Sequence, residues 1–112
     1  MVRINLINPE RLSDQHLIAE YDEILMLFGY VKKYPRLGKT PHKYTLGKGH
    51  ILFFKNKLKY LKKRHSLLKK EMKNRGFNAR ITIDLNQFDK KLIHDWKPSE
   101  ESIEIIKKRL IY

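Results

Sequence analysis

Two long stretches of this chain repeat apolar residues at alternating steps of three and four, which is the spacing of one face of an α-helix. In the first stretch the repeat comprises Leu17, Tyr21, Ile24, Phe28 and Val31. Ser13 or Asp14 can cap its start, and the pattern predicts a helix running to about Lys33. Further apolar residues widen the stripe, so we expect this helix to be central and well buried.

The second stretch predicts a helix over residues 51–75, with Gly76 as its C-terminal stop. Its apolar stripe comprises Ile51, Phe54, Leu58, Leu61, Leu68 and Met72, with His65 in register. Its other positions are mainly cationic and comprise Lys55, Lys57, Lys59, Lys62, Lys63, Arg64, Lys69, Lys70 and Lys73. One side of this helix should therefore pack on the core while the other forms a cationic surface.

The remaining segments carry weaker signals. Residues 34–50 contain two prolines and three glycines, which predicts a loop. Residues 77–97 include an alternating run that could be a short strand, but a lone strand has nothing to pair with, so we expect irregular structure. Pro98 opens a third helix that reaches about Leu110. The sequence thus predicts one all-α domain over residues 1–112, with three main helices and irregular basic loops.

The charge of the chain is strongly positive and unevenly spread. Its formal net charge is +13, from 25 lysines and arginines against 12 aspartates and glutamates. Residues 32–76 hold sixteen basic residues and a single acid, Glu71. A polyanion such as nucleic acid is the natural partner of that basic block. A solvated lysine-rich surface remains open as the simpler explanation.

The amino-acid composition also indicates the cellular environment of the protein. Cysteine is absent, which excludes disulfides and thiolate metal sites and favours a cytosolic-type environment. No apolar run approaches the ~18–20 residues of a membrane span, and no signal peptide is visible. We therefore expect a cytoplasmic protein without membrane contact, either nucleoid-associated or, if the chain is viral, in the host cytoplasm.

Two simple ligand motifs are incomplete. Residues 38–40, Gly-Lys-Thr, would need a glycine five residues before Gly38 to form a phosphate-binding loop, and Lys33 stands there. His16, Glu20 and Glu23 could bind a metal from one helical face, but no further histidine has suitable spacing. We expect neither a metal nor another cofactor.

The N-terminal third of the chain carries the most specific motif. It reads Val2-Arg3-Ile4-Asn5-Leu6, then Asp14-Gln15-His16-Leu17, then Ala19-Glu20-Tyr21-Asp22-Glu23. Further segments of the same kind are Leu46-Gly47-Lys48-Gly49-His50, Phe53-Phe54, Arg75-Gly76-Phe77-Asn78 and the stretch from Pro98 to Leu110. In order and spacing these segments resemble the phage-type pyrimidine-dimer DNA glycosylase family, also called endonuclease V of the phage kind, over roughly residues 2–110.

The resemblance implies a three-helix fold and an unusual nucleophile, the free α-amino group of Val2 after removal of Met1. An α-amine has a pKa of ~7.7–8.0, against ~10.4 for lysine, so much more of it is uncharged at neutral pH. The neutral amine would attack C1′ of a damaged nucleotide, expel the base and form an imine with the opened sugar. β-Elimination would then break the strand.

The resemblance also assigns roles to side chains. Glu23 is implied to lie beside the amine, stabilise the cationic sugar and move protons, whereas its position alone would make it an ordinary surface acid. The expected DNA contacts, from the resemblance and from the basic block, are Arg3, Gln15, His16, Arg109, Lys62 and Lys63. An exposed helix start remains open as the explanation of Gln15 and His16, and a solvated cation as that of Arg109.

The chain departs from the family pattern in ways that bear on its substrate. Asp22 and Met26 replace two arginines of the family's first helix, and the chain ends at Tyr112, before the family's aromatic-rich tail. The excised lesion therefore stays open between a pyrimidine dimer, another lesion and a plain abasic site. We expect a monomer acting on double-stranded DNA with such damage. The alternatives are a non-catalytic DNA- or RNA-binding relative and a ribosomal or chromatin-type basic protein.

Overall fold

The computed structural model describes residues 3–36, 38, 40–47 and 49–110. Its α-helices are α1 (Asp14–Lys33), α2 (His50–Phe54), α3 (Leu58–Asn74) and α4 (Glu100–Leu110). A short 3₁₀-helix at Pro9–Arg11 precedes α1, and two more, at Leu85–Gln87 and Lys90–Leu92, lie between α3 and α4. Among the described residues there is no strand, and the one isolated β-bridge joins Lys57 to Ile93. The all-α prediction is confirmed. None of the described helices is both long and apolar enough to span a bilayer.

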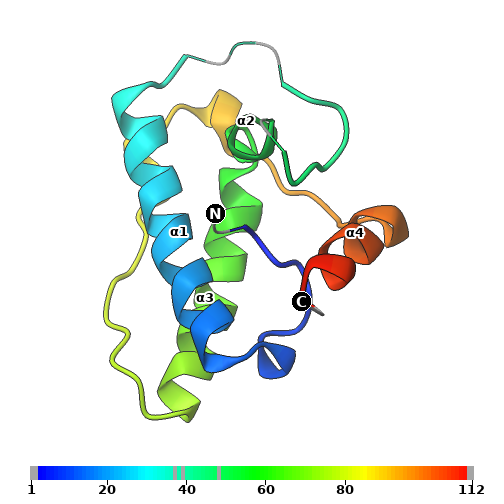
Figure 1. The fold of residues 1–112 in the computed structure, drawn as a ribbon. Coiled ribbons are helices and arrows are strands. Elements are labelled where there is room, and N and C mark those ends of the chain that lie inside the picture. Colours follow the sequence, from blue (N-terminus) through cyan, green and yellow to red (C-terminus); the bar gives the residue numbers. More distant parts are fainter. Residues whose placement is uncertain (1–2, 37, 39, 48, 111–112) are drawn as a thin grey trace.

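The antiparallel pair α1 and α3 forms the centre of the molecule (Figure 1). Fully buried leucines and isoleucines from both helices meet between them, and the largest are Leu17, Ile24, Leu27, Leu58, Leu61 and Leu68. The N-terminal segment before α1 runs between this pair and α4 in the view of Figure 1. Ile4 of that segment and Ile106 of α4 are both completely buried, so the start and the end of the described chain both contribute to the core.

Helix α1 has the bounds that its sequence predicts. Ser13 is the N-cap, and its hydroxyl accepts a hydrogen bond from the amide of His16 at 3.2 Å. All five residues of the predicted apolar stripe are buried, together with Glu20 and Leu27. The helix ends at Lys33, where two lysines of the last turn complement the helix dipole.

The predicted helix over residues 51–75 is wrong as a single element, because the chain breaks between α2 and α3. At the break Lys57 pairs with Ile93 in the isolated bridge, and its ammonium group donates to the carbonyl of Phe53 at 2.7 Å. The break turns Phe53 inward, where 2% of it is exposed, while Ile51 of the predicted stripe is 38% exposed. The apolar repeat keeps nearly the same phase on both sides of the break, so periodicity alone cannot detect it.

The prediction is also wrong for two cations of the basic surface, which are buried. Arg64 and Lys55 are 4% and 6% exposed, respectively. Arg64 is buried because it pairs with Glu20 of α1, and Lys55 because its ammonium group donates to the carbonyl of Arg36. A buried cation needs partners of this kind, and they lie too far away in sequence to be inferred from local charge.

The C-terminal half follows the prediction closely. Gly76 has φ +86°, in the left-handed region that favours glycine, and it stops α3 as expected. The segment over 77–97 is irregular and packs its aromatic residues inward, with the Phe88 ring 5.3 Å from that of Phe28. Helix α4 begins after Ser99, whose hydroxyl accepts from the amide of Ser102 at 3.1 Å.

Candidate active site

The buried N-terminal segment is held by side chains from a distant part of the chain. The backbone amide of Ile4 donates to Nε2 of His50 at 3.1 Å, and the Tyr44 hydroxyl donates to the carbonyl of Ile4 at 2.8 Å. One residue earlier, Nε of Arg3 donates to the carbonyl of Leu46 at 2.6 Å. Residues 3 and 4 are therefore fixed by the loop and helix start at residues 44–50.

The same segment contains backbone strain. Leu6 has φ 61°, and the amide of Ile7 donates to the carbonyl of Asn5 at 2.6 Å, which together form a tight γ-turn. A non-glycine residue in this conformation costs roughly 1–3 kcal/mol and persists only where the surroundings fix it. The contacts of Arg3 and Ile4 supply that constraint on the N-terminal side of the turn.

His50 presents a single tautomer to Ile4. Its Nδ1 lies 2.7 Å from the carbonyl oxygen of Thr45, which can only accept, so Nδ1 carries the hydrogen and Nε2 is left as an acceptor. Burial lowers the pKa of His50 to about 4, and the charges of Arg3 and Arg109 act in the same direction. At neutral pH the ring is therefore neutral, the only form that can accept from the Ile4 amide.

Glu23 lies on α1 within reach of the charge of Arg3. Its side chain is half-buried, and this burial raises the pKa of the carboxyl above its ordinary value, while the Arg3 charge opposes the shift. A carboxylate with an elevated proton affinity beside a cation is suited to accepting and returning a proton. The charge of Arg3, from the N-terminal segment, thus acts on the carboxyl of Glu23 in α1.

Arg109 joins this neighbourhood from α4. Its side chain is half-buried, and its positive charge opposes the rise that burial causes in the pKa of Tyr44 and contributes to the lowered pKa of His50. Arg3 acts on the same two groups. Two arginines from opposite ends of the chain therefore converge on the residues that hold Ile4.

The predicted nucleophile, Val2, lies outside the described residues. Arg3, its direct neighbour, is 7% exposed. Because consecutive Cα atoms are ~3.8 Å apart, the amide of Arg3 limits how far an amine on residue 2 can lie from this site. Arg3 is therefore the described residue closest in sequence to the predicted nucleophile.

Gln15 and His16 occupy the first turn of α1. Gln15 is exposed, and Nδ1 of His16 lies 2.9 Å from the hydroxyl of Ser13. His16 precedes Glu23 by seven residues, which places both on one face of α1, about 10 Å apart along the helix axis. A ligand lying along this face would meet both residues.

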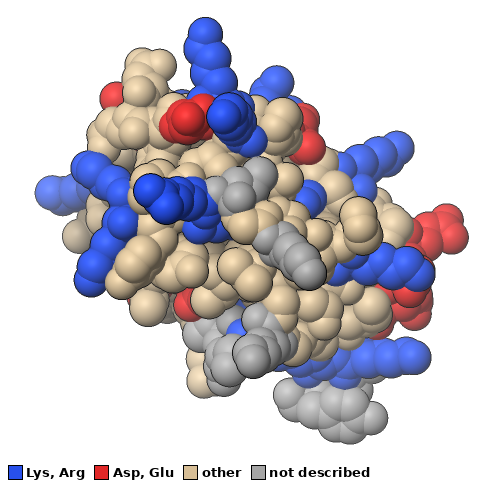
Figure 2. Space-filling model, turned by 90° about the horizontal axis from the view of Figure 1, so that it is seen from above, with Lys and Arg blue, Asp and Glu red and all other residues tan. Residues whose placement is uncertain are grey.

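The cations of α3 have partners of their own. Lys63 is exposed and forms an ion pair with Asp95 at 2.5 Å, while Lys62 is half-buried. Lys69 donates to the Thr82 hydroxyl at 3.1 Å. Figure 2 shows lysines and arginines projecting from several sides of the face it views, and not as one compact patch. The predicted cationic face of α3 is therefore interrupted, because Arg64 is buried and Lys63 and Lys69 already have partners.

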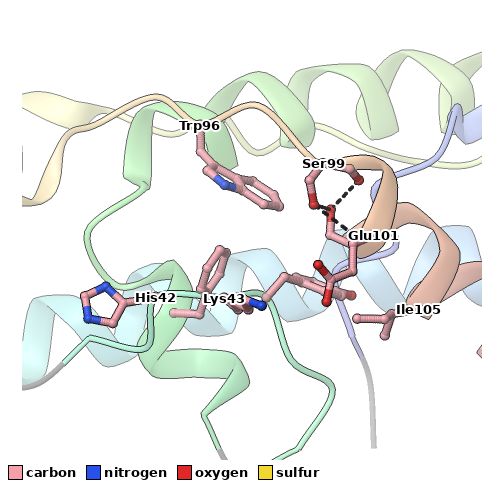
Figure 3. A pocket seen from close by; sticks show the side chains of 9 residues that line it. His42, Lys43, Trp96, Ser99, Glu101 and Ile105 are labelled. Atoms are coloured by element: carbon pink, nitrogen blue, oxygen red, sulfur yellow. Dashed lines mark hydrogen bonds between the residues drawn. The ribbon is translucent and has the colours of Figure 1, made fainter.

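One cavity of the structure adjoins the predicted site without coinciding with it. That cavity has a volume of about 240 Å³ and lies between the loop before α2 and the start of α4 (Figure 3). Its lining comprises His42, Lys43, Tyr44, Phe53, Trp96, Ser99, Glu101, Ser102 and Ile105. Only Tyr44 belongs to both places, since its hydroxyl holds Ile4 while its ring forms part of the cavity wall.

The possible metal site of His16, Glu20 and Glu23 is not formed in the structure. Both carboxylate oxygens of Glu20 bind Arg64, at 2.6 and 3.0 Å, and cannot also face His16 and Glu23. Across the described part of the chain, no group of three or more histidines, aspartates or glutamates is arranged to hold a metal ion.

Sequence patterns miss two residues of this site, Tyr44 and His50. His50 belongs to the glycine-rich segment that carries the family resemblance, yet its spacing suggests no role. Both side chains bind backbone atoms of Ile4, 40 and 46 residues away in sequence. Contacts from a side chain to a distant backbone leave no pairwise signature in a single sequence.

Fold and site together define a small, cationic, all-helical protein with a half-buried carboxylate beside the anchored start of its chain. The family model described as pyrimidine dimer DNA glycosylase matches residues 1–85. The match covers most of the 112 residues, and the chain belongs to the pyrimidine dimer DNA glycosylase family. The resemblance noted in the sequence is confirmed, and the family indicates a DNA glycosylase acting on DNA.

Proposed function

We propose that this protein is a DNA glycosylase with abasic-site lyase activity, in which the α-amine of Val2, freed by removal of Met1, is the nucleophile. The observation that carries the proposal is that the charge of Arg3 acts on the half-buried carboxyl of Glu23. Arg3 is buried, its charge acts on a carboxyl whose pKa burial has raised, and the amine belongs to the residue directly before it.

The proposed chemistry needs only groups of the chain, the substrate and water. The lone pair of the neutral amine attacks C1′ of the damaged nucleotide, and the bond from C1′ to the base breaks. Loss of the amine proton and opening of the sugar give an imine. Removal of a C2′ proton then expels the 3′ phosphate by β-elimination, and water releases the enzyme from the sugar.

Glu23 is the group we assign to the charge and proton steps. An ionised Glu23 stabilises the cationic sugar that forms as the base departs. Its raised proton affinity lets it take a proton in one step and return it in another, which typically contributes 10²–10⁴-fold to a rate. Glu20, one turn earlier, is bound to Arg64 and is not available for this role.

The remaining predicted residues are assigned to DNA binding. Arg3 and Arg109 would hold phosphates beside the reacting carbon, since both charges reach the site that anchors Ile4. Gln15 and His16 would contact the backbone further along α1, and Lys62 and Lys63 would add non-specific grip. We propose that one domain, as a monomer, makes these contacts to damaged double-stranded DNA.

Borohydride trapping on a duplex with one abasic site tests the mechanism. We expect a covalent adduct that maps to residue 2. A matched pair of variants serves as the control, because Val2→Ala keeps a small residue after Met1 whereas Val2→Leu disfavours its removal and shifts the amine by one residue. Trapping should survive in the first and fall sharply in the second. Tight DNA binding without any adduct would identify a non-catalytic DNA-binding relative instead.

A further inference from the structure

We propose that His50 and Tyr44 are positioning residues that hold the backbone of Ile4, and through it the amine of residue 2, in the geometry of attack. The two side chains together are called the Ile4 anchor. This proposal rests on the amine mechanism above. It adds that the rate of imine formation depends on groups that never touch the substrate.

The Ile4 anchor satisfies both backbone groups of one fully buried residue. The Ile4 amide has His50 Nε2 as its acceptor, and the Ile4 carbonyl has the Tyr44 hydroxyl as its donor. Buried amides and carbonyls are normally satisfied by regular secondary structure, and here two side chains do this instead. Both backbone polar groups of Ile4 are thereby held by side chains from a distant part of the chain.

The distance from Ile4 to the amine is short. One residue, Arg3, separates Ile4 from residue 2, and Arg3 is itself bound to the Leu46 carbonyl at 2.6 Å. Two Cα–Cα steps span at most ~7 Å, so little chain is available to absorb a displacement of Ile4. Because a misplacement of about 1 Å can cost 100-fold in rate, the anchor should be visible in the chemistry.

The Ile4 anchor is itself rigid. The Thr45 carbonyl holds His50 Nδ1 at 2.7 Å and thereby fixes the ring and its tautomer. The rings of Tyr44 and His50 contact each other with centroids 5.4 Å apart, and both pack against Phe54. On the far side of Ile4 the strained turn at Leu6 shows that the segment is held away from its intrinsic preference.

Three variants separate positioning from simple stabilisation. Tyr44→Phe removes the one oxygen that donates to Ile4 and keeps the ring that packs against Phe53 and Phe54. His50→Gln keeps an acceptor near the place of Nε2, which serves Ile4. His50→Asn instead keeps a polar group near the place of Nδ1, which serves Thr45. Three quantities are measured for each variant. They are the single-turnover rate of borohydride trapping on abasic DNA, the affinity for that DNA and the midpoint of thermal unfolding.

We expect Tyr44→Phe and His50→Asn to slow trapping at least tenfold while DNA affinity changes less than twofold, and His50→Gln to trap faster than His50→Asn. Rates measured well below each thermal midpoint exclude loss of folded protein as the cause. Equal trapping by Tyr44→Phe and the unaltered protein would overturn the proposal and leave the amine mechanism standing. If the unaltered protein forms no adduct, the mechanism and the positioning role are both refuted.

Discussion

Helix α1 carries two glutamates, one turn apart, and the charge of an arginine acts on each of them. One glutamate is fixed in an ion pair, whereas the other keeps a raised pKa. Glu20 is completely buried and makes two hydrogen bonds to Arg64, which is 4% exposed and also donates to the carbonyl of Ile7. Glu23 is half-buried, and the charge of Arg3 reaches it without cancelling the rise that burial causes in its pKa. The first pair joins α1, α3 and the N-terminal segment, whereas Glu23 is the carboxylate to which we assign the proton steps of the proposed reaction.

The difference lies in how completely each carboxylate is paired. A charge-assisted bidentate pair such as Glu20 with Arg64 fixes its ions, and the complete burial of Glu20 keeps a substrate proton away from its carboxylate. Glu23 keeps the proton affinity and solvent access that acid–base chemistry requires. Residue type and helix position are nearly the same, so pairing and burial separate the structural glutamate from the one that we propose to be reactive.

The largest effect we expect is from Glu23→Gln, which keeps the shape of the side chain and removes its charge. Strand cleavage should fall by roughly 10²–10⁴-fold while affinity for abasic DNA changes little. Asp22→Asn, at the adjacent exposed position, is the matched control and should cleave normally. Gel-based cleavage and a binding titration measure the two quantities. Normal cleavage by Glu23→Gln would remove Glu23 from the mechanism.

Glu20→Gln should show the reverse pattern, a loss of stability with the chemistry retained. Removing one partner leaves Arg64 charged and buried, which costs about 3–5 kcal/mol of the free energy of unfolding. Urea denaturation measures that loss, and cleavage per folded molecule should stay within a few-fold. Asp14→Asn disturbs an exposed pair with Arg75 and should hardly change stability. A stable, inactive Glu20→Gln would reverse the roles assigned to the two glutamates.

The two regions also contain one buried histidine each, which predicts how stability depends on pH. Burial lowers the pKa of His65 to about 4, as it does for His50, and the Lys69 charge lowers the His65 value further. His65 stacks on Tyr21 at 4.6 Å, and within the described residues its Nε2 has no hydrogen-bond partner. Both rings therefore stay neutral in the folded state until the pH approaches 4.

The free energy of unfolding should therefore fall as the pH drops from about 6.5 towards 4. Between these values the unfolded chain binds more protons than the folded one, so acid favours unfolding, by on the order of 1–3 kcal/mol per histidine. Urea denaturation at several pH values of His65→Phe, which retains an aromatic ring against Tyr21, should show a flatter dependence. An unchanged slope would show that His65 is not one of the groups that titrate on unfolding.

Sequence patterns predict the helix pair α1 and α3, and the candidate site beside it, only in part. Periodicity and the Ser13 cap fix α1, and Gly76 fixes the end of α3, because those signals are local. The break before Leu58 and the burial of Arg64 depend on partners in other elements, so local charge and periodicity predict both wrongly. Glu23 is found through the family resemblance and not through any pattern that would distinguish it from Glu20.

The smallest effect we expect concerns the sequence neighbours of Arg64. Lys62→Gln removes a cation for which the structure assigns no ion pair within the described residues, whereas Lys63 is already paired with Asp95. Removing a cation that neutralises one phosphate should reduce the steepness of a plot of log DNA-binding constant against log salt concentration by about 0.9. Because Lys63 is already paired, Lys62→Gln should flatten this plot more than Lys63→Gln. DNA titrations at several salt concentrations compare the two. Because neither lysine reaches Glu20, stability should be unaffected, and slopes unchanged from that of the unaltered protein in both variants would show that α3 faces away from DNA.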